Sequence, residues 1–271
     1  MPPIRKLISY LPYYIELLGK RLNGKGNMNP HRNGEFKVLK NAISKSRDDE
    51  FVYIDGGANV GSNALQAHKY STKTGKPVKI IAIEPIEKTF QQLASNTSSI
   101  PMILINKALG NSNKPLEMNI DPNSPYSGSN SAISHYYLDS NSTETVHQTT
   151  LDDLASELNI NHINFLKLDL EGYELNALLG AKRLIKMESI DYIQLEYNQT
   201  WIKAGSSIEA LLKIIDKSCY SLYRIASRTL LKISSYHYTI EDFYYSNLLL
   251  VRRGCPLPLQ CSREASPVIE K

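Results

Sequence analysis

FVYIDGGANVGSNAL, residues 51–65, is the stretch that decides the fold. It begins with an apolar run that ends at Asp55, continues through a cluster of glycines, and ends in a helical pattern from Ser62 onward. Glycines at such a turn permit a tight change of direction and let a ligand approach the backbone closely. In parallel sheets, ligands bind beyond the carboxyl ends of the strands. The stretch therefore predicts a strand, a ligand-binding turn and a helix within a parallel α/β sheet.

Apolar runs and helical patterns alternate along most of the chain. We expect strands at residues 51–55, 78–84, 102–106, 163–169, 190–197, 220–225 and 244–252. We expect helices at residues 62–70, 87–95, 151–158, 174–185 and 207–218. Such alternation indicates a parallel sheet covered by helices on both faces. Because residues 226–243 contain no clear helix to carry the chain back across the sheet, we expect the last strand to be antiparallel.

The alternating part predicts one main domain, residues 35–253, with extra segments at both ends. Residues 1–34 are expected to form an amphipathic basic helix and a linker rich in Gly and Asn. Residues 110–150 interrupt the alternation with a segment rich in Asn, Ser and Pro. We interpret this segment as a lid, because long loops in compact domains often carry function. Residues 254–271 are expected to be a flexible tail.

The N-terminal segment carries the whole formal charge of the protein. Residues 1–26 contain five Lys or Arg and one acidic residue, a balance of +4, which equals the +4 of the 271-residue chain. Apolar residues recur there at helical spacing, at Ile4, Leu7, Ile8, Leu11, Ile15 and Leu18. Two interpretations are open: the helix contacts a membrane surface or a partner, or it covers the core of the main domain. No apolar run reaches the 18 residues that a membrane span requires.

Composition also bounds the partners and the compartment. A formally neutral main domain argues against nucleic acid, since phosphate binding requires many Lys and Arg contacts. The three cysteines, Cys219, Cys255 and Cys261, show neither a disulfide framework nor a zinc spacing. We therefore expect reduced thiols and a cytoplasmic protein, with attachment to a membrane surface as a further option. The sequence does not predict an oligomeric state.

The glycine turn favours one kind of nucleotide-like ligand over another. The residues GGANVG lack the GxGxxG spacing of dinucleotide sites, and Asp55 precedes the glycines instead of following them by about 20 residues. A carboxylate at this point would repel a pyrophosphate but attract an ammonium group. Glu84 ends the second strand, where it is placed to accept hydrogen bonds from ribose hydroxyls. A ligand with an amino-acid end, a ribose and no phosphate is S-adenosylmethionine, which we favour over NAD. The alternative is that the glycines serve only the turn.

Five motifs occur in an order that resembles a known family. IDGGANVGSNAL, IAIEP, TTLDDL, FLKLDLEGYELNALLGA and IQLEYN follow one another as in the FkbM-type methyltransferases, which are class I S-adenosylmethionine-dependent O-methyltransferases. The resemblance covers roughly residues 36–252. It implies a Rossmann-like α/β fold with a seven-stranded, mostly parallel sheet, its last strand antiparallel, and helices on both faces. It also implies methyl transfer to a hydroxyl of a sugar, glycan, glycolipid or polyketide-like acceptor. The alternative is a catalytically inactive binding or scaffolding module.

The resemblance assigns cofactor contacts residue by residue. It places the methionine part of the cofactor at Asp55, Gly56, Gly57, Asn59 and Gly61. Glu84 is expected to hold the ribose. The residues after the third strand are expected to flank the adenine; they are Asn106, Ala108 and Leu109.

The catalytic residues are expected at the ends of the fourth and fifth strands. Asp169 and Glu171 are expected to orient the cofactor or the acceptor hydroxyl. Lys167 is a base if burial lowers its pKa, or else it forms an ion pair with Asp169. Glu196 is expected to bind the acceptor. A metal is not required, but Mg²⁺ is an alternative cofactor with Asp169, Glu196 and Asn198 as its oxygen ligands.

Overall fold

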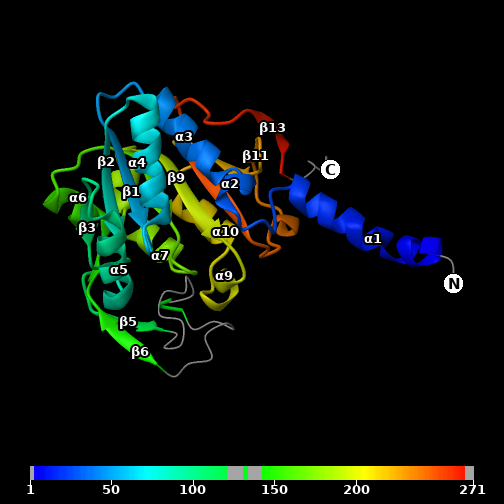
Figure 1. Cartoon of the computed structure of the whole chain (residues 1–271), viewed down its shortest axis with the longest axis horizontal. Coiled ribbons are helices and arrows are strands. Elements are labelled where there is room, and N and C mark those ends of the chain that lie inside the picture. The colour runs from blue at the N-terminus through cyan, green and yellow to red at the C-terminus, as the bar shows by residue number, and fades with distance from the viewer. Residues whose placement is uncertain (1–2, 121–130, 134–141, 266–271) are drawn as a thin grey trace.

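The structure is a computed structural model, and it describes residues 3–120, 131–133 and 142–265. Its centre is a nine-stranded sheet in the order β13-β11-β10-β12-β9-β8-β1-β2-β3 (Figure 1). The strands of this sheet are β1 (Phe51–Gly56), β2 (Val78–Ile83), β3 (Ile103–Ile105), β8 (Ile163–Leu168), β9 (Ile190–Tyr197), β10 (Tyr220–Ile225), β11 (Leu230–Ile233), β12 (Ser246–Arg252) and β13 (Cys261–Glu264). Two short pairs lie outside it: β4 (Ala108–Leu109) with β7 (Gln148–Thr149), and β5 (Leu116–Asn119) with β6 (Thr143–Val146).

The described helices cover both faces of the sheet, except for α1, which lies apart from it (Figure 1). They are α1 (Pro3–Leu22), α2 (Pro30–Asn33), α3 (Glu35–Lys45), α4 (Ser62–Thr74), α5 (Glu87–Thr97), α6 (Leu151–Glu157), α7 (Glu174–Leu179), α8 (Lys182–Lys186), α9 (Thr200–Lys203) and α10 (Ile208–Ile214), with a 3₁₀ turn at Tyr238–Ile240. Apolar residues of α3, α4 and α5 pack on one face of the sheet. Those of α6, α7, α8 and α10 pack on the other face. The expected two-sided parallel architecture is confirmed.

Seven of the nine strands form the class I methyltransferase sheet. Five neighbouring strands, in the order β9-β8-β1-β2-β3, run parallel to one another. β12 runs antiparallel to both of its neighbours, β9 and β10. Of these seven strands, the antiparallel strand β12 is the last along the chain, but it lies inside the sheet. The expected class and the antiparallel strand at 244–252 are confirmed, but the expected count of seven strands is too low.

The two additional strands extend the edge that β10 would otherwise form. β11 pairs antiparallel with β10, and β13 pairs parallel with β11. The expectation that residues 254–271 are a flexible tail is wrong for the part up to 265, since Leu259 is buried and the backbone N–H of Ala265 donates to Lys232 O at 2.6 Å. An open strand edge leaves backbone donors and acceptors unpaired, and the tail satisfies some of them. The main domain therefore extends past the expected boundary at residue 253.

The helix expected at 174–185 is divided in two. α7 ends at Leu179 and α8 begins at Lys182, with Gly180 between them. A side chain at Gly180 would place its Cβ only 1.9 Å from the backbone oxygen of Gly110. The close approach of these two backbones explains why glycine, a weak helix former, interrupts the pattern.

α1 projects away from the domain (Figure 1). Its apolar side chains Leu11, Tyr14, Ile15, Leu18 and Leu22 are each more than half exposed. The interpretation that this helix covers the core is therefore wrong for its described side chains. Among the described residues, no helix is both long and apolar enough to cross a membrane.

Candidate functional site

The turn after β1 brings two loops into close contact. The backbone N–H groups of Gly57 and Ala58 both donate to Ile83 O, at 3.0 and 2.9 Å. Gly57 has φ +76°, and a Cβ on it would lie 2.0 Å from the backbone oxygen of Asp169. Only glycine fits this position without moving the loop after β8. The sequence FVYIDGG thus positions the ends of β1, β2 and β8 against one another.

Glu84 is fixed at the end of β2 by backbone donors. Its carboxylate accepts hydrogen bonds from the N–H groups of Asn59, at 3.0 Å, and Ile86, at 3.1 Å. Burial raises the pKa of Glu84 to about 7. Asn106 supports the same loop from behind, since its side-chain amide donates to the backbone oxygens of Glu84 and Pro85 at 3.1 Å.

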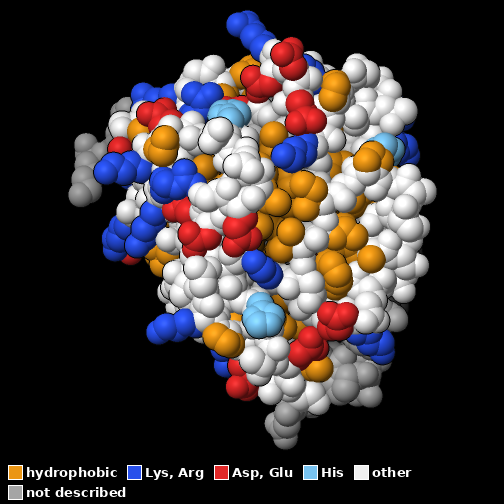
Figure 2. Space-filling view, turned by 90° about the vertical axis from the view of Figure 1, so that its left-hand side faces the viewer, with side chains coloured by type: hydrophobic (Ala, Val, Ile, Leu, Met, Phe, Trp, Pro, Cys, Tyr) orange, Lys and Arg blue, Asp and Glu red, His pale blue; other side chains and the backbone are white. Residues whose placement is uncertain are grey.

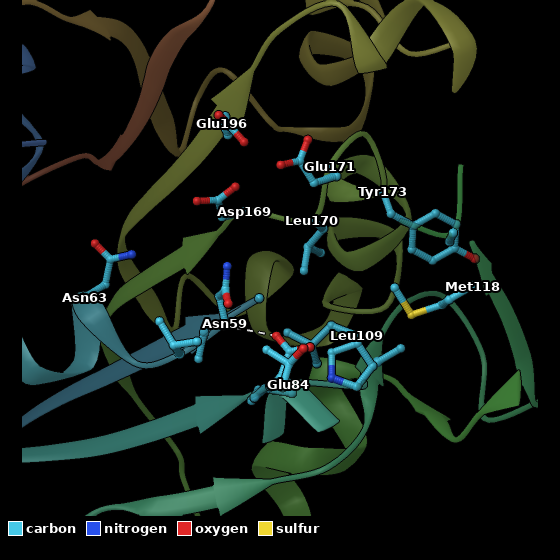
Figure 3. Close-up of a pocket in the computed structure, with 18 of the residues that line it drawn as sticks. Asn59, Asn63, Glu84, Leu109, Met118, Asp169, Leu170, Glu171, Tyr173 and Glu196 are labelled. Carbon is cyan, nitrogen blue, oxygen red and sulfur yellow. Dashed lines mark hydrogen bonds between the residues drawn. The ribbon is translucent and has the colours of Figure 1, made fainter. Parts of the chain in front are cut away.

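A cavity of about 290 Å³ opens over the carboxyl ends of these strands. Asn59, Glu84 and Leu109 lie at one end of it, and three carboxylates lie at the other (Figure 3). Of the expected cofactor residues, those that line the cavity are Gly57, Asn59, Glu84, Ala108 and Leu109. Of the expected catalytic residues, those that line it are Asp169, Glu171 and Glu196. The structure thus brings the glycine turn, Glu84, the residues after β3, the loop after β8 and the end of β9 to one cavity. This is expected for the carboxyl edge of a parallel sheet.

Four expected cofactor residues lie behind the cavity wall. Gly56, Gly61 and Asn106 shape the loops but do not line the cavity. Asp55 is fully buried beneath the turn, and neither of its carboxylate oxygens has a hydrogen-bond partner among the described residues. Burial raises the pKa of Asp55 to about 6. A buried carboxyl without partners is costly, so this position marks a place where a ligand with hydrogen-bond donors would be favourable.

The loop after β8 holds Glu171 in an unusual backbone conformation. Glu171 has φ +51°, a region that few residues other than glycine adopt. Glu174, buried at the start of α7, fixes the loop by accepting hydrogen bonds from the N–H groups of Leu170, at 2.8 Å, and Gly172, at 3.3 Å. Burial raises the pKa of Glu174 to about 7. Backbone strain of this kind is common at functional sites.

Asp169, Glu171 and Glu196 form what we call the acidic cluster. One carboxylate oxygen of each lies within 4.8 Å of those of the other two, and Figure 3 shows the three side chains facing one another. Burial and the neighbouring Asp169 raise the pKa of Glu171 to about 8. The same two causes raise the pKa of Glu196 well above its usual range. Burial opposes the lowering of the Asp169 pKa, but the Lys167 ammonium and a side-chain hydrogen bond with Glu196 together outweigh burial, so that pKa is lowered.

Lys167 does not fit the role of a base. It lies below the cavity, with its Nζ 2.6 Å from Asp169 Oδ2. Burial alone would lower its pKa, but the carboxylates of Asp169, Asp55 and Glu35 reverse this effect and raise it. The alternative interpretation, an ion pair that supports the loop, describes what the structure shows.

Glu35 is a buried acid that the sequence analysis missed. Its carboxylate accepts hydrogen bonds from Gln194 Nε2 at 2.9 Å and from the Tyr245 hydroxyl at 3.3 Å. Tyr245 in turn lines the cavity. Glu35 is separated from all of the quoted motifs, and an acidic residue in the first turn of a helix is ordinarily an exposed, dipole-favoured residue. No sequence signal distinguishes it.

Asn198 does not lie among the cluster oxygens. Its Oδ1 accepts hydrogen bonds from the backbone and the hydroxyl of Thr200, both at 2.7 Å, at the start of α9. A side-chain hydrogen bond from Asn198 also lowers the pKa of Glu171. Asn198 is therefore a support for Glu171, and its role as a metal ligand stays a prediction.

Part of the expected lid lines the cavity. Leu116 and Met118 of β5, together with Ala132 and Tyr173, form the apolar wall opposite the glycine turn. Gln148 of β7 donates to the Tyr173 hydroxyl at 3.2 Å and so links the lid to the loop after β8. The rest of the lid, at residues 121–130 and 134–141, lies outside the described residues.

Solved structures of methyltransferases are among those that this chain matches at low similarity. The methyltransferase domain of METTL16 matches 82% of this chain and 67% of its own, with 10% identity and a TM-score of 0.46. An rRNA methylase of Streptococcus thermophilus matches 84% of this chain and 99% of its own, with 11% identity and a TM-score of 0.42. Likeness at this level says nothing about substrate.

Sequence comparisons are more informative. The hexuronic acid methyltransferase AglP of Haloferax volcanii is 24% identical over 185 residues, which are 68% of this chain and 69% of that protein. The model of the methyltransferase FkbM domain matches residues 55–224, more than half of the chain. This range includes both ends of the cavity: the glycine turn with Glu84, and the acidic cluster. The protein is an S-adenosylmethionine-dependent methyltransferase and belongs to the FkbM family.

Proposed function

We propose that the protein transfers a methyl group from S-adenosylmethionine to a hydroxyl group of a sugar, glycan, glycolipid or polyketide-like acceptor. The observation that carries this proposal is the cavity itself, which joins the glycine turn and Glu84 to the acidic cluster. One end is suited to the cofactor and the other to a hydroxyl. This division is what methyl transfer to oxygen requires.

The residues at the first end fit the cofactor. Asn59 lines the cavity, and its buried Oδ1 atom has no hydrogen-bond partner among the described residues, so a cofactor ammonium group would satisfy it. Asp55, behind the cavity wall, would add a favourable negative charge. Glu84 would accept hydrogen bonds from two ribose hydroxyls, and the backbone at Ala108 and Leu109 would flank the adenine. S-adenosylmethionine supplies a methyl group on a positively charged sulfur, which becomes a neutral thioether once the methyl group has left.

The residues at the second end fit the acceptor. Asp169 and Glu171 would hold the hydroxyl by hydrogen bonds, and Glu196 would approach it from β9. When the oxygen–methyl bond forms and the sulfur–methyl bond breaks, the hydroxyl loses its proton, and we assign that proton to a carboxylate oxygen of Glu171. Positioning of the two reacting atoms supplies most of the rate enhancement in such a transfer.

The charges favour a hydroxyl over a carboxylate as the acceptor group. The only Lys or Arg among the described cavity-lining residues is Lys107, which follows β3 at the cofactor end. The sequence contains no Lys or Arg from Pro115 to Leu166, a range that includes the whole central part of the lid. A carboxylate placed at the acidic cluster would find no side-chain cation above it to pair with. The side chains by themselves therefore favour ether formation on a hydroxyl over ester formation on a uronic acid. A cation bound at the cluster would remove this preference, so the alkali test below decides between the two products.

The other candidate functions have less support. An inactive scaffold would not need the complete set of acids at both ends of the cavity. For nucleic acid, the face at the β3 edge offers no uniform basic surface, since its Lys and Arg side chains are mixed with Asp and Glu around an apolar area (Figure 2). We therefore keep the proposal of a small-molecule or glycan acceptor, in a cytoplasmic protein.

The cofactor is tested by ligand-dependent melting. S-adenosylhomocysteine at about 100 times its Kd adds roughly 2.7 kcal/mol to the free energy of unfolding, a shift of several degrees for a chain of this size. We expect this shift with S-adenosylhomocysteine and not with NAD, and we expect Glu84→Ala to reduce it. No shift in the wild-type protein would overturn the proposal.

The reaction is tested with labelled S-adenosylmethionine and a panel of glycosides that carry free hydroxyls or free carboxylates. An ether product keeps its labelled methyl group in alkali, whereas a methyl ester releases it as methanol. We expect alkali-stable label. Alkali-labile label would show that the protein methylates a carboxyl group and would replace the hydroxyl proposal.

A further inference from the structure

We propose that Asp169, Glu171 and Glu196 bind one divalent metal ion of the Mg²⁺ or Mn²⁺ type at the acceptor end of the cavity. The existence of this site is inferred from the geometry of the acidic cluster alone. Its role in methyl transfer rests on the proposed function. The set of three carboxylates replaces the one expected from the sequence, in which Asn198 stood in place of Glu171.

The spacing of the three carboxylates suits one ion. Their ligand oxygens lie within 4.8 Å of one another. Ligand oxygens lie about 2.0–2.1 Å from Mg²⁺ and about 2.3–2.6 Å from Ca²⁺, so two oxygens on opposite sides of one ion are about 4–5 Å apart. Three carboxylates, each using one oxygen, leave further positions for water or an acceptor oxygen. This is an open, oxygen-only site of the kind that Mg²⁺ and Mn²⁺ prefer.

One member of the cluster, Glu196, has an unpartnered carboxylate oxygen. Glu196 is 8% exposed, and its Oε2 atom has no hydrogen-bond partner among the described residues. Its backbone oxygen accepts a hydrogen bond from Trp201 Nε1 at 3.0 Å, which fixes the backbone at this position. Figure 3 shows the Glu196 carboxylate directed toward Asp169 and Glu171. A buried acceptor without a donor is costly, and a cation would remove that cost.

The side chains around the cluster provide too little positive charge. Lys167 forms its ion pair with Asp169, at 2.6 Å on Oδ2, and no Lys or Arg pairs with Glu171 or Glu196 among the described residues. Lys107, at the far end of the cavity, lies 3.4 Å from Glu157. The lid sequence has no Lys or Arg after Lys114 to place above the cluster. A bound divalent cation would neutralise this excess of negative charge.

A second acidic group in the same protein shows what a compensated cluster looks like. Asp191 lies near Asp48 and His162 in a comparable arrangement. Its carboxylate, however, accepts hydrogen bonds from Arg252 Nη2 at 2.7 Å and from Asn164 Nδ2 at 3.0 Å, and pairs with His162 Nε2 at 3.0 Å. No described oxygen of Asp191 is left unpartnered. This second group therefore has no vacancy for a metal and serves as an internal control.

The ion would act on the acceptor as a Lewis acid, which lowers the pKa of a coordinated hydroxyl and stabilises the alkoxide. Each carboxylate contributes one oxygen, so the second oxygen of Glu171 stays available for the hydroxyl proton. The cofactor end of the cavity is not part of the site. Cofactor binding is therefore expected without metal.

The experiment is Mn²⁺ titration of the full chain, followed by electron paramagnetic resonance of the free ion, without acceptor and both with and without S-adenosylhomocysteine. We expect one saturable site in the wild-type protein. Glu196→Gln and Glu171→Gln are expected to weaken Mn²⁺ binding at least tenfold, and Mg²⁺ is expected to displace Mn²⁺. Asp191→Asn is expected to leave Mn²⁺ binding unchanged.

Two results would overturn the proposal: no saturable Mn²⁺ binding by the wild-type protein, or equal binding by the wild-type protein and Glu196→Gln. The melting shift with S-adenosylhomocysteine, measured in EDTA, checks that each variant is folded and tests the proposed function separately. A normal shift without Mn²⁺ binding would reject the metal site alone. Mn²⁺ binding without a shift would retain the metal site and reject the cofactor assignment.

Discussion

The two acidic groups at opposite ends of β8 and β9 have similar compositions and opposite environments. At the carboxyl end, the acidic cluster faces a cavity, and its buried Glu196 keeps an unpartnered oxygen. At the amino end, Asp191 is surrounded by Arg252, His162 and Asn164, which satisfy both of its oxygens. The carboxylates of the acidic cluster are destabilised by burial and by one another, whereas the Asp191 carboxylate is stabilised by its partners.

The difference separates function from stability. Parallel strands place a ligand at their carboxyl ends, so acids there are kept unpaired for a ligand or an ion. Acids at the amino ends serve the fold and are neutralised by their neighbours. Removing an acid from the first group should therefore cost activity, and removing one from the second should cost stability.

The largest expected effect is on activity. Glu171→Gln removes the proposed proton acceptor, a role that contributes about 10²–10⁴-fold to rate. The melting temperature should stay the same or rise, because repulsion from Asp169 is relieved. Single-turnover transfer of labelled methyl groups measures the first effect and calorimetry the second. A loss of stability without a loss of rate would place Glu171 with the structural acids.

The next effect is on stability. Asp191→Asn leaves Arg252 and His162 without their anionic partner, and breaking a largely buried ion pair costs about 3 kcal/mol. Urea denaturation measures this change in the free energy of unfolding. The Kd for S-adenosylhomocysteine should be unchanged at a temperature where the variant is folded. Unchanged stability would show that the amino-end group is not the compensated one.

Cofactor affinity should depend on pH through Glu84. Burial raises the pKa of this carboxyl to about 7 in the free protein, and the ionised form is the better acceptor for ribose hydroxyls. Affinity for S-adenosylhomocysteine should therefore increase about tenfold as pH rises from 6 to 8, and Glu84→Gln should remove the dependence. Calorimetric titration across this range measures it. Equal slopes in both proteins would assign the dependence to another group.

A smaller pH effect should appear at the amino end. The hydrogen bond to Asp191 raises the pKa of His162, so its contribution to stability is full below about pH 6.5 and is lost as pH rises through the raised value. Burial opposes the lowering of the Asp191 pKa, but hydrogen bonds from His162 and Arg252 prevail, so its contribution is full above about pH 4 and is lost in stronger acid.

The two contributions overlap between about pH 4 and 6.5. His162 is partly exposed, so its pair with Asp191 is worth about 0.2–1 kcal/mol. His162→Asn should therefore be less stable than the wild-type protein at pH 5.5 and equal to it at pH 9, as measured by urea denaturation. The same deficit at both pH values would point to lost packing instead of lost charge.

The smallest effect should follow from removing α1. The described contacts of this helix with the domain include Lys20, whose Nζ lies 4.0 Å from the ring centroid of Tyr244, and an exposed contact of this kind contributes little to stability. Deletion of residues 1–22 should leave both acidic groups and the melting temperature nearly unchanged. We propose a peripheral membrane contact for the exposed face, so the deletion should also abolish cosedimentation with anionic vesicles. A large drop in melting temperature would restore the core-covering interpretation.

Much of the fold was predictable because its signals are local. The expected strand at 190–197 matches β9, and the expected helix at 151–158 matches α6 to within one residue. The Thr150 hydroxyl caps that helix by accepting from the Asp153 N–H at 3.1 Å. The two edge strands were missed because a strand such as β13 forms only where another strand, β11, presents an open edge.

The sequence by itself determined the alternation of strands and helices, the glycine turn at Gly57 and the presence of acids after three strands, since these depend on spacing along the chain. Tertiary structure decided which acids are compensated. Lys167 became a support for Asp169, and Asn198 became a partner of Thr200 and Glu171. Glu35 joined the buried network from a distant helix, and Glu196 kept an unpartnered oxygen. The reason is that burial and neighbouring charges set the state of a carboxylate, and its neighbours come from segments far apart in the sequence.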